Sequence, residues 1–199
     1  PSGKILAFSQ KDETNVADYP LLDINSTPGK LTSIKYPMAG QKSEHGKIGL
    51  YNLESEKVIF LETGKPLDHF LTNTTWGPEE KFIYLAEVNR DQNHMWLNQY
   101  DAKTGKKIKT LFEEKSDKWV EPEHGLYFLP NNPKEFLWLS EKNGFMNIYH
   151  YNTNGKLLNQ ITNVNWVIDN ILGFDVKGEN VIFEGTGEDP RELHAFKVN

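Results

Sequence analysis

Two carboxylates and an imidazole stand close together in one short, proline-containing stretch of this chain. Residues 119–124 read Trp-Val-Glu-Pro-Glu-His, which places Glu121, Glu123 and His124 within four positions. Proline fixes its own φ angle and restricts the residue before it, so the backbone that carries these groups is stiff. Such a set can meet the charged end of a ligand, and the competing interpretation is a solvated connection between structural units. These three residues form the predicted substrate-facing site.

Motifs for nucleophilic or metal-dependent catalysis are missing from the sequence. No serine lies in a Gly-x-Ser-x-Gly turn, which presents the nucleophile of α/β-hydrolases. No two of the six histidines have the His-x-x-x-His spacing that puts two zinc ligands on one helix face, and there is no cysteine. We therefore expect no catalytic residue, no metal site and no cofactor in these 199 residues.

Acidic residues spread along the chain raise one further class of chemistry, the hydrolysis of glycosidic bonds by a carboxylate pair. The residues with suitable positions are Glu87, Asp101, Glu141 and Asp169. Most of them lie at predicted turns or strand edges, where a carboxylate is ordinarily solvated. A glycan-active protein is therefore a minor hypothesis.

A repeating pattern indicates which elements would position these groups. Short β-branched and aromatic runs alternate with Gly, Pro and Asn turns, and no convincing helix pattern occurs. Aromatic residues recur at Tyr51, Tyr100, Tyr151 and Phe196, with spacings of 49, 51 and 45 residues. That period is the length of a four-stranded propeller blade. The sequence predicts an all-β fold, a partial β-propeller of about four blades of four-stranded antiparallel sheet.

The blades are expected at residues 1–68, 69–118, 119–165 and 166–199. The first blade is longer than the others, and we interpret residues 11–47 as an insertion between two of its strands. Loops of that length are more often functional than incidental. The tryptophans at repeating positions are interpreted as packing between blades; they are Trp76, Trp119, Trp138 and Trp166.

Charge and hydropathy exclude some partners. The formal net charge is −6 without a basic stripe, so nucleic acid is not an expected partner. The longest apolar runs fall far short of the roughly 20 residues that cross a bilayer.

The opening Pro-Ser-Gly-Lys reads as the middle of a turn, which predicts an excised segment of a larger ring. Such a segment would expose two apolar blade faces, so we expect a homo-oligomer.

Several segments, in the same order along the whole chain, resemble one family. They are Phe8-Ser9-Gln10, Asp18-Tyr19-Pro20, Tyr36-Pro37-Met38-Ala39-Gly40, Asn89-Arg90-Asp91-Gln92-Asn93, Trp119-Val120-Glu121-Pro122, Ser140-Glu141-Lys142-Asn143-Gly144 and Trp166-Val167. They resemble the propeller of the dipeptidyl peptidase IV family, in the prolyl oligopeptidase clan. The resemblance implies the later blades of an eight-bladed propeller that caps a C-terminal α/β-hydrolase domain with Ser, Asp and His. It also implies an exported bacterial parent, periplasmic or extracellular, that removes dipeptides after proline or alanine.

The resemblance also bears on site residues. The family's paired glutamates, which bind the substrate's amino terminus, would precede this chain, and Glu79 and Glu80 are not assigned that role. Relatives place an aromatic residue and an arginine in the stretch that corresponds to residues 119–124, where this chain has Glu and His. A dimer arm would map to residues 48–67. We expect a non-catalytic propeller portion that shapes and gates a chamber for short peptides. The alternative is a peptide- or protein-binding propeller module without a hydrolase domain.

Overall fold

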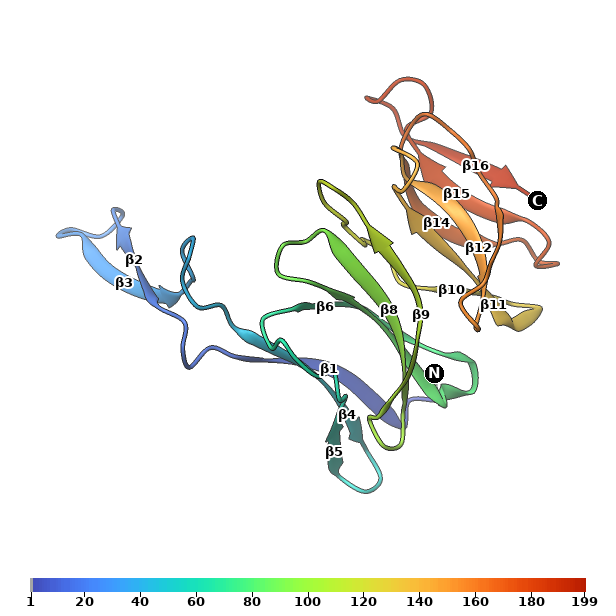
Figure 1. Cartoon of the computed structure of the whole chain (residues 1–199). Coiled ribbons are helices and arrows are strands. Elements are labelled where there is room, and N and C mark those ends of the chain that lie inside the picture. The colour runs from blue at the N-terminus through green and yellow to red at the C-terminus, as the bar shows by residue number, and fades with distance from the viewer. Residues whose placement is uncertain (1) are drawn as a thin grey trace.

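The computed structural model describes residues 2–199; Pro1, which opens the turn expected at the start of the chain, lies outside the described residues. The described chain forms four antiparallel sheets of three or four strands and one separate hairpin (Figure 1). The prediction of an all-β fold is confirmed. No helix in residues 2–199 is long and apolar enough to cross a membrane.

The four sheets follow one another along the chain, and within each sheet the strands lie side by side in chain order. The first sheet contains β1 (Ile5–Asp12), β4 (His45–Asn52) and β5 (Lys57–Phe60). The second contains β6 (Phe70–Trp76), β7 (Phe82–Val88), β8 (His94–Asp101) and β9 (Lys107–Lys115), with η1 (Pro78–Glu80) between β6 and β7. The third contains β10 (Tyr127–Leu129), β11 (Asn132–Ser140), β12 (Asn147–Asn152) and β13 (Leu157–Gln160). The fourth contains β14 (Ile168–Phe174), β15 (Val181–Gly185) and β16 (His194–Val198).

A long connection leaves the first sheet between β1 and β4, which pair with each other along their full lengths. Within this connection, residues 13–44, lie β2 (Asp18–Asp23) and β3 (Lys30–Lys35), which pair only with each other. We call residues 13–44 the arm, and Figure 1 shows it projecting away from the sheets. Residues 48–67, to which the dimer arm was mapped, instead contain most of β4 and all of β5. The mapping of the dimer arm to these residues stays a prediction, and in this chain the segment belongs to the first sheet.

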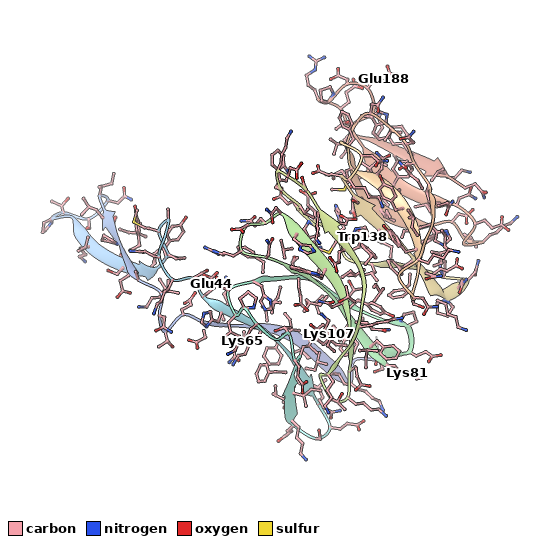
Figure 2. All side chains as sticks on the ribbon, viewed as in Figure 1. Glu44, Lys65, Lys81, Lys107, Trp138 and Glu188 are labelled. Carbon is pink, nitrogen blue, oxygen red and sulfur yellow. The ribbon has the colours of Figure 1, made fainter. Side chains whose placement is uncertain are left out.

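Apolar side chains fill the spaces between successive sheets. Neighbouring residues of a strand point to opposite faces, so each central strand contributes side chains to the spaces on both sides of its sheet. On β11, Leu137 packs toward the fourth sheet. Trp138, labelled in Figure 2, packs toward the second sheet. On β7, Ile83 packs toward the first sheet and Tyr84 toward the third. Each large buried side chain contributes about 1.5–3 kcal/mol, so these faces hold the stack together.

Two glycine turns bring the backbones of neighbouring sheets into contact. Gly105, in the β8–β9 turn, has φ 74°, and its carbonyl oxygen accepts the N–H of Glu62 at 2.8 Å. A Cβ at Gly105 would clash with the carbonyl oxygen of Phe60. Gly155, in the β12–β13 turn, has φ 88°, and a Cβ there would clash with the carbonyl oxygen of Leu111. Both turns therefore require glycine for conformation and for space.

The connections that carry the predicted site gather at one edge of the stack. Antiparallel strands reverse direction at every connection, so the connections alternate between two edges. Lys115 at the end of β9 pairs with His94 at the start of β8, which puts the β9–β10 linker beside the β7–β8 turn. Arg90 in that turn donates a hydrogen bond to Oγ of Ser43, in the arm, at 3.2 Å. We call this edge, shared by arm, turn and linker, the arm rim.

Candidate functional site

The linker between β9 and β10, residues 116–126, is held by hydrogen bonds on two sides. The N–H of Val120 donates to the carbonyl oxygen of Gln92, in the β7–β8 turn, at 2.7 Å. On the other side, Nδ2 of Asn73 on β6 donates to the carbonyl oxygen of Pro122 at 2.8 Å. Asn73 has φ 56°, a left-handed conformation that asparagine tolerates better than most residues. These bonds fix the position of the predicted site residues.

The three predicted site residues lie on this linker but differ in exposure. Glu121 and Glu123 are exposed, whereas 18% of the His124 side chain is exposed. Nε2 of His124 lies 3.8 Å from Oε2 of Glu123, and it has no hydrogen-bond partner among the described residues. Of the three, Glu121 lines the cavity that the linker borders, and Glu123 and His124 lie outside its wall.

That cavity, of about 330 Å³, opens on the arm rim between the second and third sheets. Its wall is formed by the end of β9, the linker, the end of β11 and the β11–β12 turn. The side chains that decide its chemistry are Glu114, Lys118, Trp119, Glu121, Glu141 and Lys142. A cavity of this size accommodates an amino-acid side chain or a short peptide end.

Trp119 on the cavity wall corrects the sequence interpretation of the tryptophans. It was assigned to packing between blades, yet 58% of Trp119 is exposed, whereas Trp138 is fully buried. The reason is the path of the chain: at residue 119 the linker has left the sheet, so no facing strand covers the indole. Trp76 and Trp166 are partly buried against the cores, in agreement with the interpretation.

The cavity wall includes a partly buried carboxylate, Glu114, that sequence analysis did not identify. Its oxygens accept hydrogen bonds from Nε1 of Trp138 at 3.2 Å and from Oγ of Ser140 at 2.9 Å. Burial raises the pKa of the Glu114 carboxyl, an effect that the hydrogen bonds and the nearby Lys142 oppose. Glu114 is the middle residue of Glu-Glu-Lys at the end of β9, and only the period-two alternation of the strand hints that it points inward.

Lys142 lines the cavity, and its ammonium group contacts two tyrosines. Its Nζ donates a hydrogen bond to the hydroxyl of Tyr151 at 2.8 Å and lies 3.7 Å from the centre of the Tyr149 ring. Burial lowers the pKa of Lys142, and the Glu114 carboxylate opposes that shift. The ammonium group of Lys142 is therefore engaged by Tyr149 and Tyr151.

Carboxylates crowd at the cavity mouth. The pKa of Glu141 is raised, first by burial and then by the negative charges of Glu123 and Glu121. No ion pair joins any of these three carboxylates to a lysine or arginine within residues 2–199. Negative charge is thus concentrated at the cavity mouth, beside the exposed indole of Trp119.

The four acids considered for glycoside hydrolysis do not form one site. Glu87 is buried in β7, where its Oε1 accepts hydrogen bonds from Nδ2 of Asn98, at 2.6 Å, and from the hydroxyl of Tyr100. Asp101 lies at the opposite end of the β7–β8 pair and accepts the N–H groups of its own turn. Asp169 is exposed on β14, and Glu141 lies at the cavity mouth. Glu87 and Asp101 therefore have structural roles.

Histidine rings mostly pair with neighbouring acids. Nε2 of His94 lies 2.8 Å from Glu113, and Nε2 of His150 lies 2.8 Å from Glu135. Across residues 2–199, no group of three or more His, Cys, Asp or Glu side chains could hold a metal ion.

Comparison with known proteins gives a consistent result. The family described as the dipeptidyl peptidase IV (DPP IV) N-terminal region matches residues 1–199. A probable dipeptidyl-aminopeptidase B of Uncinocarpus reesii is 26% identical over 98% of this chain and 24% of its own length. Dipeptidyl-aminopeptidase B of Aspergillus niger is 27% identical over 99% of this chain and 25% of its own length. The chain thus spans about a quarter of the curated relatives that it matches.

Solved structures of similar proteins share this fold. A putative dipeptidyl aminopeptidase IV from Bacteroides ovatus superposes with a TM-score of 0.91 at 39% identity, covering 99% of this chain and 30% of that one. Dipeptidyl peptidase 4 of Porphyromonas gingivalis superposes with a TM-score of 0.82 at 23% identity, covering 98% and 28%, and it supports the fold alone. The sheets therefore match part of a propeller, as the repeat pattern predicted.

Proposed function

Because the chain belongs to the dipeptidyl peptidase IV N-terminal region family, we propose that it is the non-catalytic propeller portion of a serine-type dipeptidyl peptidase. Its role is to shape and gate the chamber through which short peptides reach the catalytic site, for release of N-terminal dipeptides after proline or alanine. The observation that carries this proposal is the family match along the entire chain. The catalytic serine, aspartate and histidine would belong to a C-terminal α/β-hydrolase domain.

The arm rim supports the gating part of the proposal. It combines a fixed linker, an open cavity of about 330 Å³ and several uncompensated carboxylates. A rigid, polar rim can orient a peptide without changing shape, because hydrogen bonds hold its backbone before any ligand arrives. The parent protein is proposed to act in the periplasm or extracellular space of a bacterium.

The arm supports the proposal of a homo-oligomer. Its two strands expose a cross-strand pair of apolar side chains, with Leu22 63% and Leu31 70% exposed. A two-stranded hairpin is marginally stable alone in water, so such a surface gains from contact with a second copy. We therefore propose self-association through the projecting arm, in addition to the open faces of the first and fourth sheets.

The proposed function is tested by hydrolysis of a Gly-Pro chromogenic amide. We expect the complete gene product to release the chromophore and the 199-residue chain alone to release none. Release by the 199-residue chain would mean that it holds an unidentified nucleophile. Inactivity of the complete gene product would favour a peptide-binding propeller without peptidase activity.

A further inference from the structure

We propose that the cavity between the second and third sheets binds a cationic side chain, lysine or arginine, of a peptide substrate. The side chain would lie along the indole of Trp119 with its charge at Glu121 and Glu141. The inference rests on the proposed function, since a peptide substrate would bring such a side chain to the arm rim. It adds a substrate class: peptides that carry a positive charge at one defined position.

The first argument is the unbalanced charge of the cavity mouth. Glu121 and Glu141 both line the cavity, and Glu123 lies close enough to Glu141 to disfavour its ionised form. In the described part of the chain, neither Glu121 nor Glu141 makes a side-chain hydrogen bond or ion pair. A bound cation would remove this repulsion, whereas a carboxylate-bearing ligand would increase it. The mouth therefore selects positive over negative groups.

The second argument is that two of the three lysines lining the cavity are engaged elsewhere. Nζ of Lys142 contacts the hydroxyl of Tyr151 and the ring of Tyr149. Nζ of Lys115 lies 3.4 Å from Oε2 of Glu113, on the neighbouring part of β9. Neither ammonium group neutralises the carboxylates at the mouth. Lys118, the third lysine of the wall, makes no ion pair with a carboxylate within residues 2–199, so a positive charge from outside the chain would be the first to pair with these groups.

The third argument is the indole. More than half of Trp119 is exposed at the cavity wall, and Nζ of Lys118 already lies 5.9 Å from its ring centre, the outer limit for a cation–π contact. The ring can therefore accept a better-placed cation. An alkyl stem along the indole with an ammonium or guanidinium at the carboxylates satisfies both halves of a lysine or arginine side chain. The volume of about 330 Å³ suits such a side chain and is far larger than a bare metal ion needs.

The test compares charged and neutral peptides of equal shape. The complete gene product is assayed with Gly-Pro tetrapeptides that carry lysine at the third or fourth position, and with Lys-Pro-initiated peptides. Each has a partner in which norleucine replaces lysine. For at least one position we expect kcat/KM for lysine to exceed that for norleucine by about three- to tenfold, through KM, because partly exposed ion pairs and cation–π contacts are each modest.

Variants identify the cavity as the source of that ratio. The double substitution Glu121→Gln with Glu141→Gln should bring the ratio close to one. Trp119→Leu should reduce it by about twofold to threefold, since one partly exposed cation–π contact is lost. The control is Glu188→Gln, an exposed acid in the β15–β16 connection at the far tip of the fourth sheet, and it should leave the ratio intact (Figure 2).

The outcomes separate this inference from the proposed function. Hydrolysis without lysine preference, or a preference that survives the double substitution, overturns the inference and leaves the peptidase assignment in place. If no peptide is cleaved, the proposed function fails, and calorimetric titration of the same peptide pairs decides the inference. Lysine-selective binding that the double substitution removes would support it, and equal binding of lysine and norleucine peptides would overturn it.

Discussion

Nδ2 of Asn73 donates a 2.8 Å hydrogen bond to the carbonyl oxygen of Pro122, which ties strand β6 to the linker that carries Glu121 and Glu123. Asn73 has φ 56° at the point where the β6–β7 pairing shifts register. The irregularity in the strand is what turns the amide group toward the linker. A local departure from ideal sheet geometry therefore positions the cavity wall, and irregularities of this kind recur near functional sites.

The first prediction concerns this bond. Asn73→Ala should lower the free energy of unfolding by about 1–3 kcal/mol, because it removes the hydrogen bond and places a Cβ-bearing residue at positive φ. Asn73→Gly removes the same bond without the backbone strain and should cost about 1 kcal/mol. Urea denaturation of both variants measures the difference. Equal losses would show that the backbone at residue 73 is not strained.

A second prediction concerns the contact between sheets at Gly155. Gly155→Ala should destabilise the protein by more than about 3 kcal/mol, since the new Cβ meets the carbonyl oxygen of Leu111 and the backbone cannot yield cheaply. Gly144→Ala is the matched control, because Gly144 has φ 100° but open space around a new Cβ. It should cost about 1–2 kcal/mol from conformation alone. Thermal unfolding of the two variants is the measurement, and similar losses would contradict close packing of the sheets.

Some features of this fold follow from the sequence pattern, and others do not. Two of the four recurring aromatic positions lie in the core, since Tyr100 is 0% and Tyr151 5% exposed, whereas Tyr51 and Phe196 are only partly buried. Alternation along one strand fixes which side chains face inward, and that information is local. The exposure of Trp119 depends on where a linker leaves its sheet, and the cavity at Glu141 depends on two blades meeting. Neither relation can be predicted from the spacing of residues along the chain.

A third prediction concerns pH and Glu114. Burial raises the pKa of this carboxyl in the folded protein, so the folded state binds more protons than the unfolded state above the ordinary value of 4.5. Its contribution to stability is therefore greatest at low pH and falls as pH rises from 4.5 through the raised pKa. Glu114→Gln cannot ionise, so the stability of the natural protein relative to this variant should fall as pH rises through that window.

The neighbouring residue supplies a control of opposite sign. A hydrogen bond with His94 lowers the pKa of the Glu113 carboxyl, so its contribution is present above pH 4.5 and is lost as pH falls through the lowered pKa. Chemical denaturation at half-unit steps from pH 3 to pH 8 follows both differences. If Glu114→Gln and Glu113→Gln gave the same pH trend, the raised pKa of Glu114 in the folded protein would be disproved.

The last prediction concerns the arm. Leu22 and Leu31 face each other across β2 and β3 and are both largely exposed, so lysine at both positions should hardly change the melting temperature. If the arm contacts a second copy, the same change buries two charges in that interface and should weaken self-association at least about tenfold. Sedimentation velocity over a concentration series measures it. Val176→Lys, at a fully exposed apolar residue between β14 and β15, adds a charge elsewhere and should leave association unchanged. If the double arm variant associates as the natural protein does, the interface lies on the open faces of the first and fourth sheets instead. If the natural protein stays monomeric at every concentration, neither surface is an interface.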